Sequence, residues 1–421
     1  MIETKELLPG VTLRCCRDTR FKQGCISFQF IRRTDHREAH LNALLPSVML
    51  RATKRHPDIR SICQHLDNLY GAGVGPLVRR VGDFHTIGFY ANFMDDRFAL
   101  EGESVLKGVA EFLEELLLES PVEDGGFLRE LVESEKKNLI SAIESALNNK
   151  SAYVRENLIL AMCAPDSFGV PRLGRKEQVA EITAKALYEH YLKIRRESPL
   201  EIFYVGSADL DTMASLFLPV VSAWERSGLA MPEQHPLKTA EPSEETLRLD
   251  VNQGKLCMGF VTDITVRSSE FAAMQIFNAL FGQGMTSKLF RNVRESLSLC
   301  YSIGSAFVST KGILTVSAGI DFDREDQVRR EILHQLDLCR AGEITPEELH
   351  CAREAVRSSL RSIQDSPGSI EGYHFQSALT DPALTYEAYI AALDQVTVEQ
   401  VAAVAGRLRY HSSRFLKGVE A

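Results

Sequence analysis

Two side chains that could hold a peptide, Arg294 and Tyr301, stand seven residues apart where a helical pattern gives way to a strand pattern. The helix is expected to end near Leu297, and Tyr301 to open the strand. A guanidinium and a phenol that converge at this corner could hydrogen-bond a peptide carbonyl or its oxyanion. The alternative is an exposed arginine beside a half-buried strand tyrosine. The apolar helix residues expected to face inward are Leu289, Phe290 and Val293.

A second pattern, His36-Arg37-Glu38-Ala39-His40, raises the question of a metal site. Two histidines four apart share one face of a helix and could bind zinc together. Zinc peptidase motifs place the glutamate base beside a histidine, whereas Glu38 lies about 200° around the helix from each. The segment also follows a polar run, 32–35. We therefore interpret it as an exposed polar loop that leads into a helix.

A glycine-containing segment, Phe281 to Phe290, resembles a phosphate-binding loop at first sight. It lacks the P-loop spacing, and the chain contains no GxGxxG. Gly282 and Gly284 more simply allow the chain to turn between a buried helix and the next one. No Ser/His/Asp or Cys/His grouping stands out, although such partners need not be close in sequence. An autonomous hydrolase with an unrecognised site is therefore the weakest functional hypothesis.

The elements that position these residues occur twice, at an offset of roughly 220–230 residues along the chain. Each half starts with a strand, a polar loop and an apolar helix. A second helical segment and two alternating strands follow, and then a helix, a polar turn and a long helix. The fold class is therefore α+β, with antiparallel sheets covered by helices. The strand and helix pairs that open the halves are Gly24–Ile31 with Leu41–Leu50 and Leu256–Thr262 with Ala272–Phe281.

The later elements of the repeat follow the same order. Strands are expected at Gly71–Arg79 and His85–Ala91, and again at Cys300–Val308 and Ile313–Ile320. The second pair is joined by a Lys311-Gly312 turn. The long helices are Phe127–Ser145 and Glu347–Ile363. A proline-containing stretch without apolar periodicity separates the halves. The domains are therefore expected at 1–226 and 246–421, with a linker at 227–245.

Composition limits the classes of function that remain. The 421 residues carry a net charge of −9, so no large basic face for nucleic acid is expected. The start of the chain does not resemble a signal peptide, and no run of about 18 apolar residues predicts a membrane span. Nine irregularly spaced cysteines, none in a CxxC, indicate buried thiols in a reducing compartment. The predicted location is the cytoplasm.

The run GMTSKLFRNVRESLSLCYSIGSAF, Gly284 to Phe307, resembles the C-terminal signature of the pitrilysin/insulinase peptidase superfamily. The duplicated α+β half, repeated across the chain, is similar to that family's clamshell architecture. In the family, the arginine and tyrosine of this pattern bind the substrate peptide and support the transition state. The resemblance assigns these positions to Arg294 and Tyr301, at the family's spacing.

The first half departs from the family pattern. Active members carry HxxEH on an apolar helix, shortly before a Gly-Thr pair and a basic residue. If Ala52-Thr53 takes the place of Gly-Thr, the two histidines become Ala43 and Ser47, and the glutamate base becomes Pro46. The downstream glutamate ligand falls on Ala142. A catalytic zinc needs three protein ligands, which these residues do not supply.

The resemblance therefore implies no metal, no cofactor and no catalytic residues in this chain. The family's supporting glutamate corresponds to Glu135, which we expect to be an ordinary acid on a helix surface.

Some bacterial members of the superfamily work as pairs, in which one subunit carries HxxEH and the other the Arg/Tyr pair. The leading hypothesis is a non-catalytic subunit that forms a dimer with an HxxEH-bearing homologue and binds the peptide through Arg294 and Tyr301. The alternative is a peptide- or protein-binding scaffold without proteolysis. Short insulinase-like proteins of that kind occur near genes for peptide maturation and for modification of elongation factor P.

Overall fold

A computed structural model describes residues 2–227 and 231–419. The chain divides into two compact units, and each unit takes one segment from the opposite half of the sequence. Unit 1 consists of Met1–Glu144, Val170–His235 and Ile363–Gln376, and unit 2 of Ser145–Gly169, Pro236–Ser362 and Ser377–Ala421. The predicted halves, 1–226 and 246–421, therefore describe the order of the repeat, whereas the compact units interleave.

Unit 1 is built on a six-stranded sheet in the order β1-β2-β8-β3-β5-β4. Its pairs are antiparallel except β2 with β8, which run parallel. One face packs on helices α1, α3, α7 and α8 to form the main core. The strands are β1 Ile2–Leu8, β2 Val11–Arg17, β3 Gln23–Arg33, β4 Gly73–Val81, β5 Phe84–Met94 and β8 Leu200–Gly206.

Unit 2 repeats this topology in a five-stranded sheet, β11-β12-β10-β13-β9. The counterpart of the β2–β8 pair, β9 with β13, is again parallel, and the other pairs are antiparallel. The duplication read from the sequence is thus confirmed strand by strand, with β1 as an addition to unit 1. The strands are β9 Glu244–Leu249, β10 Gly254–Val261, β11 Ser302–Val308, β12 Ile313–Ile320 and β13 Arg409–Gly418.

The helices follow the predicted order. The apolar helices are α1 Ala39–Met49 and α9 Phe271–Gly282, and the long ones are α4 Arg129–Ser145 and α11 Pro346–Ser362. Almost every residue of α9 is buried, as expected for a helix that is apolar all round. The remaining helices are α2 Ile59–Asn68, α3 Val105–Leu118, α5 Lys150–Met162, α6 Lys176–Glu181, α7 Ala184–Glu197, α8 Leu210–Ser222, α10 Glu325–Arg340, α12 Pro367–Thr380, α13 Tyr386–Asp394 and α14 Val398–Gly406.

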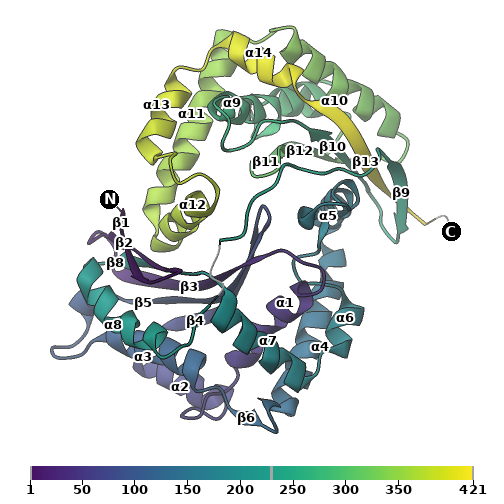
Figure 1. Cartoon of the computed structure of the whole chain (residues 1–421). Helices are drawn as coiled ribbons and strands as arrows, with labels where there is room; N and C mark the ends of the chain where they lie inside the picture. The colour runs from purple at the N-terminus through teal and green to yellow at the C-terminus, as the bar shows by residue number, and fades with distance from the viewer. Residues whose placement is uncertain (1, 228–230, 420–421) are drawn as a thin grey trace. The chain divides into compact units, whose positions relative to one another are not determined.

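The first exchanged segment is the start of α12, which lies against the sheet of unit 1 (Figure 1). Successive strand residues point to opposite faces, so Ser27 and Gln29 of β3 face away from the core that holds Phe28. Glu371 of α12 is fully buried there and accepts hydrogen bonds from Ser27 Oγ (2.6 Å) and Gln29 Nε2 (3.0 Å). Arg79 of β4 adds two more, at 2.9 and 2.8 Å.

The second exchanged segment is α5, which packs on β10 and β13 of unit 2 (Figure 1). This contact is apolar: Leu158 and Met162 of α5 form a buried cluster with Cys257 of β10. A Cβ atom on Gly259 would lie 2.3 Å from Met162 Sδ, so the glycine lets this side chain pack closely against the strand. Both sheets are therefore covered on two faces.

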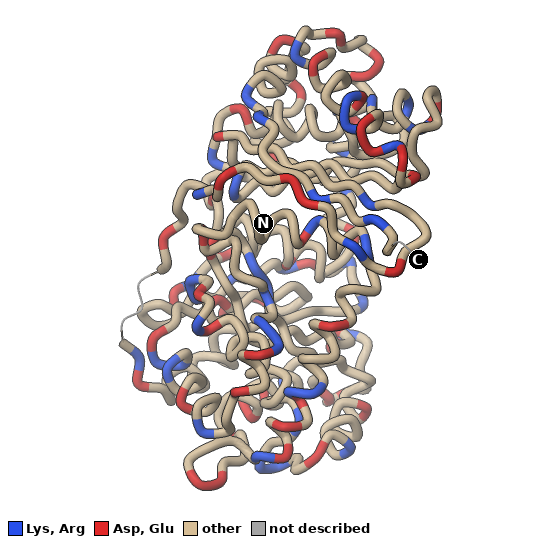
Figure 2. The backbone as a smooth tube through the Cα atoms, turned by 90° about the vertical axis from the view of Figure 1, so that its right-hand side faces the viewer, with Lys and Arg blue, Asp and Glu red and all other residues tan. Residues whose placement is uncertain are grey.

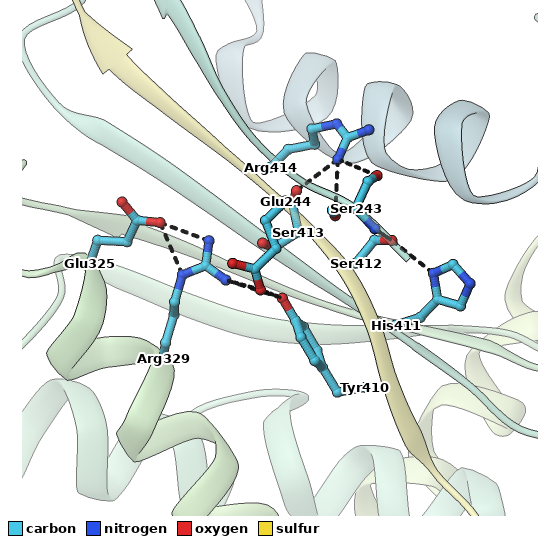
Figure 3. Close-up of polar contacts among 9 residues, drawn as sticks. All are labelled: Ser243, Glu244, Glu325, Arg329, Tyr410, His411, Ser412, Ser413 and Arg414. Atoms are coloured by element: carbon cyan, nitrogen blue, oxygen red, sulfur yellow. Dashed lines mark hydrogen bonds and ion pairs between the residues drawn. The ribbon is translucent and has the colours of Figure 1, made fainter. Parts of the chain in front are cut away.

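Within the predicted linker, 227–245, residues 228–230 lie outside the described part of the chain, and Glu244 and Glu245 already belong to β9. The residues just before them are tied to β13, where Ser243 N–H donates to Ser412 Oγ at 2.9 Å and Arg414 contacts Ser243 (Figure 3). In the same view, Tyr410 and Arg329 meet the Glu244 carboxylate. The sequence between the halves thus ends in an ordered strand rather than in a free tether.

Candidate functional site

Arg294 is carried by a π-helix, Leu289–Ser296, in unit 2. Leu289 and Val293 are fully buried and anchor it, as predicted. Phe290 was expected to face inward but is partly exposed. Residues four apart share one side of a helix, so Phe290 lies on the same side as the exposed Arg294, whose side chain covers its ring. The guanidinium carbon lies 4.6 Å from the ring centroid. π-Helices are rare and frequently occur at functional sites.

The Arg294 guanidinium is otherwise free among the residues that the structure describes. No carboxylate there forms an ion pair with it, and its side chain is exposed. Stacking on an aromatic ring covers the face of a guanidinium and leaves its edge N–H donors available. Arg294 is therefore oriented, charged and open to a ligand.

Tyr301 follows a tight turn at the end of the π-helix. Ser298 adopts a left-handed conformation, with φ 51°, which is uncommon for a residue other than glycine. The backbone N–H of Tyr301 donates to the Gly319 carbonyl at 2.8 Å and fixes the residue at the start of the β11–β12 hairpin. The ring remains 59% exposed. The predicted helix-to-strand corner is thus confirmed.

The phenol of Tyr301 donates a hydrogen bond to Asp321 Oδ1 at 2.9 Å. This hydrogen bond raises the pKa of the phenol above its usual value. Arg294, Tyr301 and Asp321 together line a cavity of about 300 Å³, whose other residues are Ser298, Leu299 and Cys300. Sequence reasoning missed Asp321. A hairpin folded about Lys311-Gly312 returns residue 321 to the level of Tyr301, and that register could have identified it.

The positions that the family resemblance assigns to a zinc site hold Ala43, Pro46, Ser47 and Ala142. Ala43 and Pro46 are buried within α1, and Ser47 is partly exposed on it. Ala142 lies exposed on α4. Across residues 2–227 and 231–419, no group of three or more His, Cys, Asp or Glu side chains is arranged to hold a metal ion. A methyl, a pyrrolidine ring and a hydroxyl do not fit the zinc that the family pattern implies.

Glu135 is not the surface acid expected from the sequence. It is buried, with 8% of its surface exposed, and Arg51 Nε lies 2.7 Å from its Oε1. Asn138 Nδ2 donates a second hydrogen bond at 2.9 Å. The expectation was wrong because the guanidinium from the end of α1 satisfies the carboxylate inside unit 1. A protein cation thus pairs with the acid that supports the metal site in the family pattern.

A second internal network holds the degenerate helix in place. Asn42 of α1 donates through Nδ2 to His85 Nδ1 of β5 at 3.1 Å, and its Oδ1 lies 2.7 Å from His190 Nε2 of α7. Burial lowers the pKa of His85 to about 3 and that of His190 to about 4. Both imidazoles are therefore neutral, and the network ties α1 to β5 and α7. No sequence pattern had indicated it.

The HxExH pattern forms no metal site either. His36 lies in the exposed loop, as predicted, whereas His40 belongs to the first turn of α1. Glu38 accepts three hydrogen bonds from Arg32 and pairs with Lys193 at 2.7 Å. These cations satisfy the carboxylate, whose pKa falls to about 2 against the opposing effect of burial.

Gly284, with φ 91°, forms the turn after α9 that its sequence predicted.

Charge distribution and helix hydropathy are two further features of the chain. Lys and Arg are interspersed with Asp and Glu along the chain, and none of them gathers into one broad basic stripe in this view (Figure 2). Among the described residues, no helix is both long and apolar enough to cross a membrane.

The fold and the two sites define a class of protein. It is a duplicated α+β chain with an exposed Arg294/Tyr301 corner in one unit. In the other unit, the positions that the resemblance assigns to zinc hold residues that do not bind metals. A family model described as the peptidase M16 inactive domain matches residues 181–356. A probable inactive metalloprotease of Bacillus subtilis strain 168, YmfF, is 28% identical over 418 residues, covering 99% of this chain and 98% of that protein. YmxG of the same strain, described as an uncharacterized zinc protease, is 24% identical over 366 residues, which cover 84% of this chain and 86% of YmxG.

Among solved structures, a conserved protein from Enterococcus faecalis V583 superposes with a TM-score of 0.91 at 28% identity. The match covers 99% of both chains. The chain is therefore similar over nearly its whole length to a protein described as a probable inactive metalloprotease, and residues 181–356 match the peptidase M16 inactive domain. The matched model and the relative YmfF are both described as inactive.

Proposed function

We propose that this chain is a non-catalytic peptidase subunit that works in the cytoplasm. It binds a peptide through Arg294 and Tyr301 and pairs with an HxxEH-bearing homologue that supplies the zinc. One observation carries the proposal: a guanidinium without a carboxylate partner among the described residues shares a cavity with an exposed tyrosine, while the zinc positions lack ligands.

The chemistry of the corner supports peptide binding. A peptide presents carbonyl oxygens and, at its end, a carboxylate, and both accept hydrogen bonds from a guanidinium. Stacking on Phe290 restricts Arg294 before the ligand arrives, which lowers the entropy lost on binding. An unpaired exposed arginine contributes little to folding, so its orientation points to recognition.

The absence of ligands at the zinc positions supports the pairing. Hydrolysis by zinc needs a metal-bound water and a base, so the peptide must meet them on another chain. Bacillus subtilis strain 168 contains both a relative described as a probable inactive metalloprotease and one described as a zinc protease. The presence of both in one bacterium supports a division of roles between homologous chains.

The test titrates an HxxEH-bearing homologue from the same bacterium with this chain and follows cleavage of a fluorogenic peptide pool. Activity is expected to rise with added chain and to saturate near one to one. Arg294→Ala is expected to lower kcat/KM of the pair about 10- to 100-fold, because one charged hydrogen bond is lost. Tyr301→Phe is expected to lower it less.

The matched control is Arg291→Ala, which removes the same charge from an exposed position on the same helix, outside the cavity. This variant is expected to leave the activity of the pair unchanged. If the homologue is equally active alone, or if Arg294→Ala and Tyr301→Phe do not alter the pair, the pairing proposal fails.

A second function, a peptide- or protein-binding scaffold without proteolysis, is favoured by the Tyr301–Asp321 hydrogen bond. A phenol that already donates to a carboxylate is not free to donate to an oxyanion. Binding of peptides by the isolated chain, with no effect on cleavage by any homologue, supports this function over the first.

A further inference from the structure

The direction of the Tyr301–Asp321 hydrogen bond limits what the cavity can bind. A phenol has one hydrogen to donate, and Tyr301 donates it to Asp321 Oδ1 at 2.9 Å. Towards a ligand, the phenol oxygen therefore acts as an acceptor. The side chains that line the cavity thus offer a donor at Arg294 and acceptors at Tyr301 and Asp321.

A ligand that satisfies both kinds of group must carry an acceptor and a donor close together. The end of a peptide chain does so: its carboxylate accepts, and the N–H of the last peptide bond donates. Pairing of a guanidinium with a carboxylate is charge-assisted and roughly twice as strong as a hydrogen bond between neutral groups. An internal peptide segment offers Arg294 a neutral carbonyl instead. An N-terminal ammonium pairs with Asp321 but offers Arg294 no anionic acceptor.

We propose that the cavity between the π-helix and β12 binds the C-terminal end of a peptide. Arg294 takes the terminal carboxylate, and Tyr301 Oη together with Asp321 accepts the last backbone N–H. The inference rests on the proposed function of this corner in peptide binding and names the part of the peptide that it recognises. It makes no use of a metal or of a partner chain.

The size and walls of the cavity suit a chain end. A volume of about 300 Å³ is at the lower limit of small-molecule sites and fits the last residue or two of a peptide. Leu299 and Cys300 are buried and form an apolar part of the wall.

The test uses the purified full chain and three fluorescent, N-acetylated pools of random decapeptides. The first pool ends in a free carboxylate, the second in an amide, and in the third the last peptide nitrogen is methylated beside a free carboxylate. Affinity is measured by fluorescence anisotropy. The free-acid pool is expected to bind about tenfold more tightly than either of the others, since each of these lacks one partner.

Variants assign the effect to the cavity. Arg294→Ala is expected to abolish the preference for the free acid over the amide, and Arg294→Lys to retain part of it. Arg291→Ala, the matched control, is expected to keep the full preference. Circular dichroism and unfolding midpoints confirm that each variant is folded before its affinity is compared.

Two outcomes overturn the inference in different ways. Equal binding of the free acid and the amide, with both lost in Arg294→Ala, refutes recognition of the chain end but leaves peptide binding at this corner intact. Failure of all three pools to bind refutes recognition by the isolated chain. The cleavage assay with the HxxEH homologue then decides separately whether the proposed function fails as well.

Discussion

The two units differ in whether their charged and polar groups are paired within the protein. In unit 1, the positions that the resemblance assigns to a metal site hold alanine, proline and serine, and Glu135 is paired with Arg51. In unit 2, Arg294 has no carboxylate partner among the described residues, and Tyr301 is 59% exposed. The same duplicated topology therefore supports a closed network in one unit and an open corner in the other.

This difference separates groups that serve folding from groups that serve recognition. A buried charge without a partner is costly, so an internal network such as that around Glu135 must be complete. An exposed guanidinium without a partner costs little folding free energy, so it can remain unpaired until a ligand binds. Removal of paired groups in unit 1 is therefore expected to lower stability, whereas removal of the open groups in unit 2 is expected to lower binding alone.

The largest loss of stability is expected from Glu371→Ala in unit 1. The substitution leaves Arg79 without its carboxylate, leaves the buried Ser27 hydroxyl without its acceptor, and removes one of the two acceptors of Gln29 Nε2. The loss is expected to be about 3–5 kcal/mol, measured by urea unfolding. Glu101→Ala, which removes an exposed loop acid, is expected to change stability by less than about 0.5 kcal/mol. Equal effects of the two variants would contradict the account of α12.

Acid is expected to weaken unit 1 through His85 and His190. Both pKa values are depressed below 6.5, to about 3 and about 4, mainly by burial. The unfolded chain takes up protons first, so the stabilisation is complete above pH 6.5 and is lost as the pH falls towards these values. At pH 5, each histidine is expected to have lowered the free energy of unfolding by roughly 2 kcal/mol relative to pH 7. Urea midpoints at pH 7 and pH 5 measure the sum.

The variant His190→Gln isolates one histidine of the network. Its amide can still donate to Asn42 Oδ1 but does not titrate. The loss of stability between pH 7 and pH 5 is expected to shrink by roughly 2 kcal/mol. An unchanged loss would assign the acid sensitivity to other groups. Glu38 does not interfere, because its pKa of about 2 confines its contribution to lower pH.

A smaller loss is expected from Arg51→Ala. The Glu135 carboxylate then keeps Asn138 as a partner but loses its cation. The loss is expected to be about 1–3 kcal/mol. In the background of Glu135→Gln, the same Arg51→Ala substitution is expected to cost clearly less, and a double-mutant cycle by urea unfolding measures this coupling. Additive effects would show that the two side chains do not interact.

The smallest effect is expected from Arg294→Ala in unit 2. The guanidinium has no ion pair with a described residue, so the change in free energy of unfolding is expected to stay within about 0.5 kcal/mol. The same urea titration checks it. A loss above 2 kcal/mol would make Arg294 a structural residue and would remove the contrast between the units.

Local patterns were sufficient for most elements. Alternation and turn residues predicted the strand Ile313–Ile320 with both ends correct, and the apolar runs of α1 and α9 to within two residues. The seven-residue spacing was sufficient to bring Arg294 and Tyr301 to one corner, because helix and strand geometry act over short distances. The residue types of Ala43, Pro46, Ser47 and Ala142 predicted that the positions which the resemblance assigns to zinc lack ligands, and this assignment stays a prediction.

The tertiary structure decided what depends on residues far apart in the sequence. The exchange of α5 and α12 between the units joins Glu371 to Arg79, 292 positions away, and no local pattern encodes that contact. Burial decided that Glu135 is an internal ion-pair partner rather than a surface acid, since a helix pattern does not reveal which neighbour covers it. Hairpin register brought Asp321 to Tyr301 and so set the direction in which the phenol donates. Residue type and spacing determined which groups this protein has, and long-range packing decided which of them are satisfied internally and which remain open to a ligand.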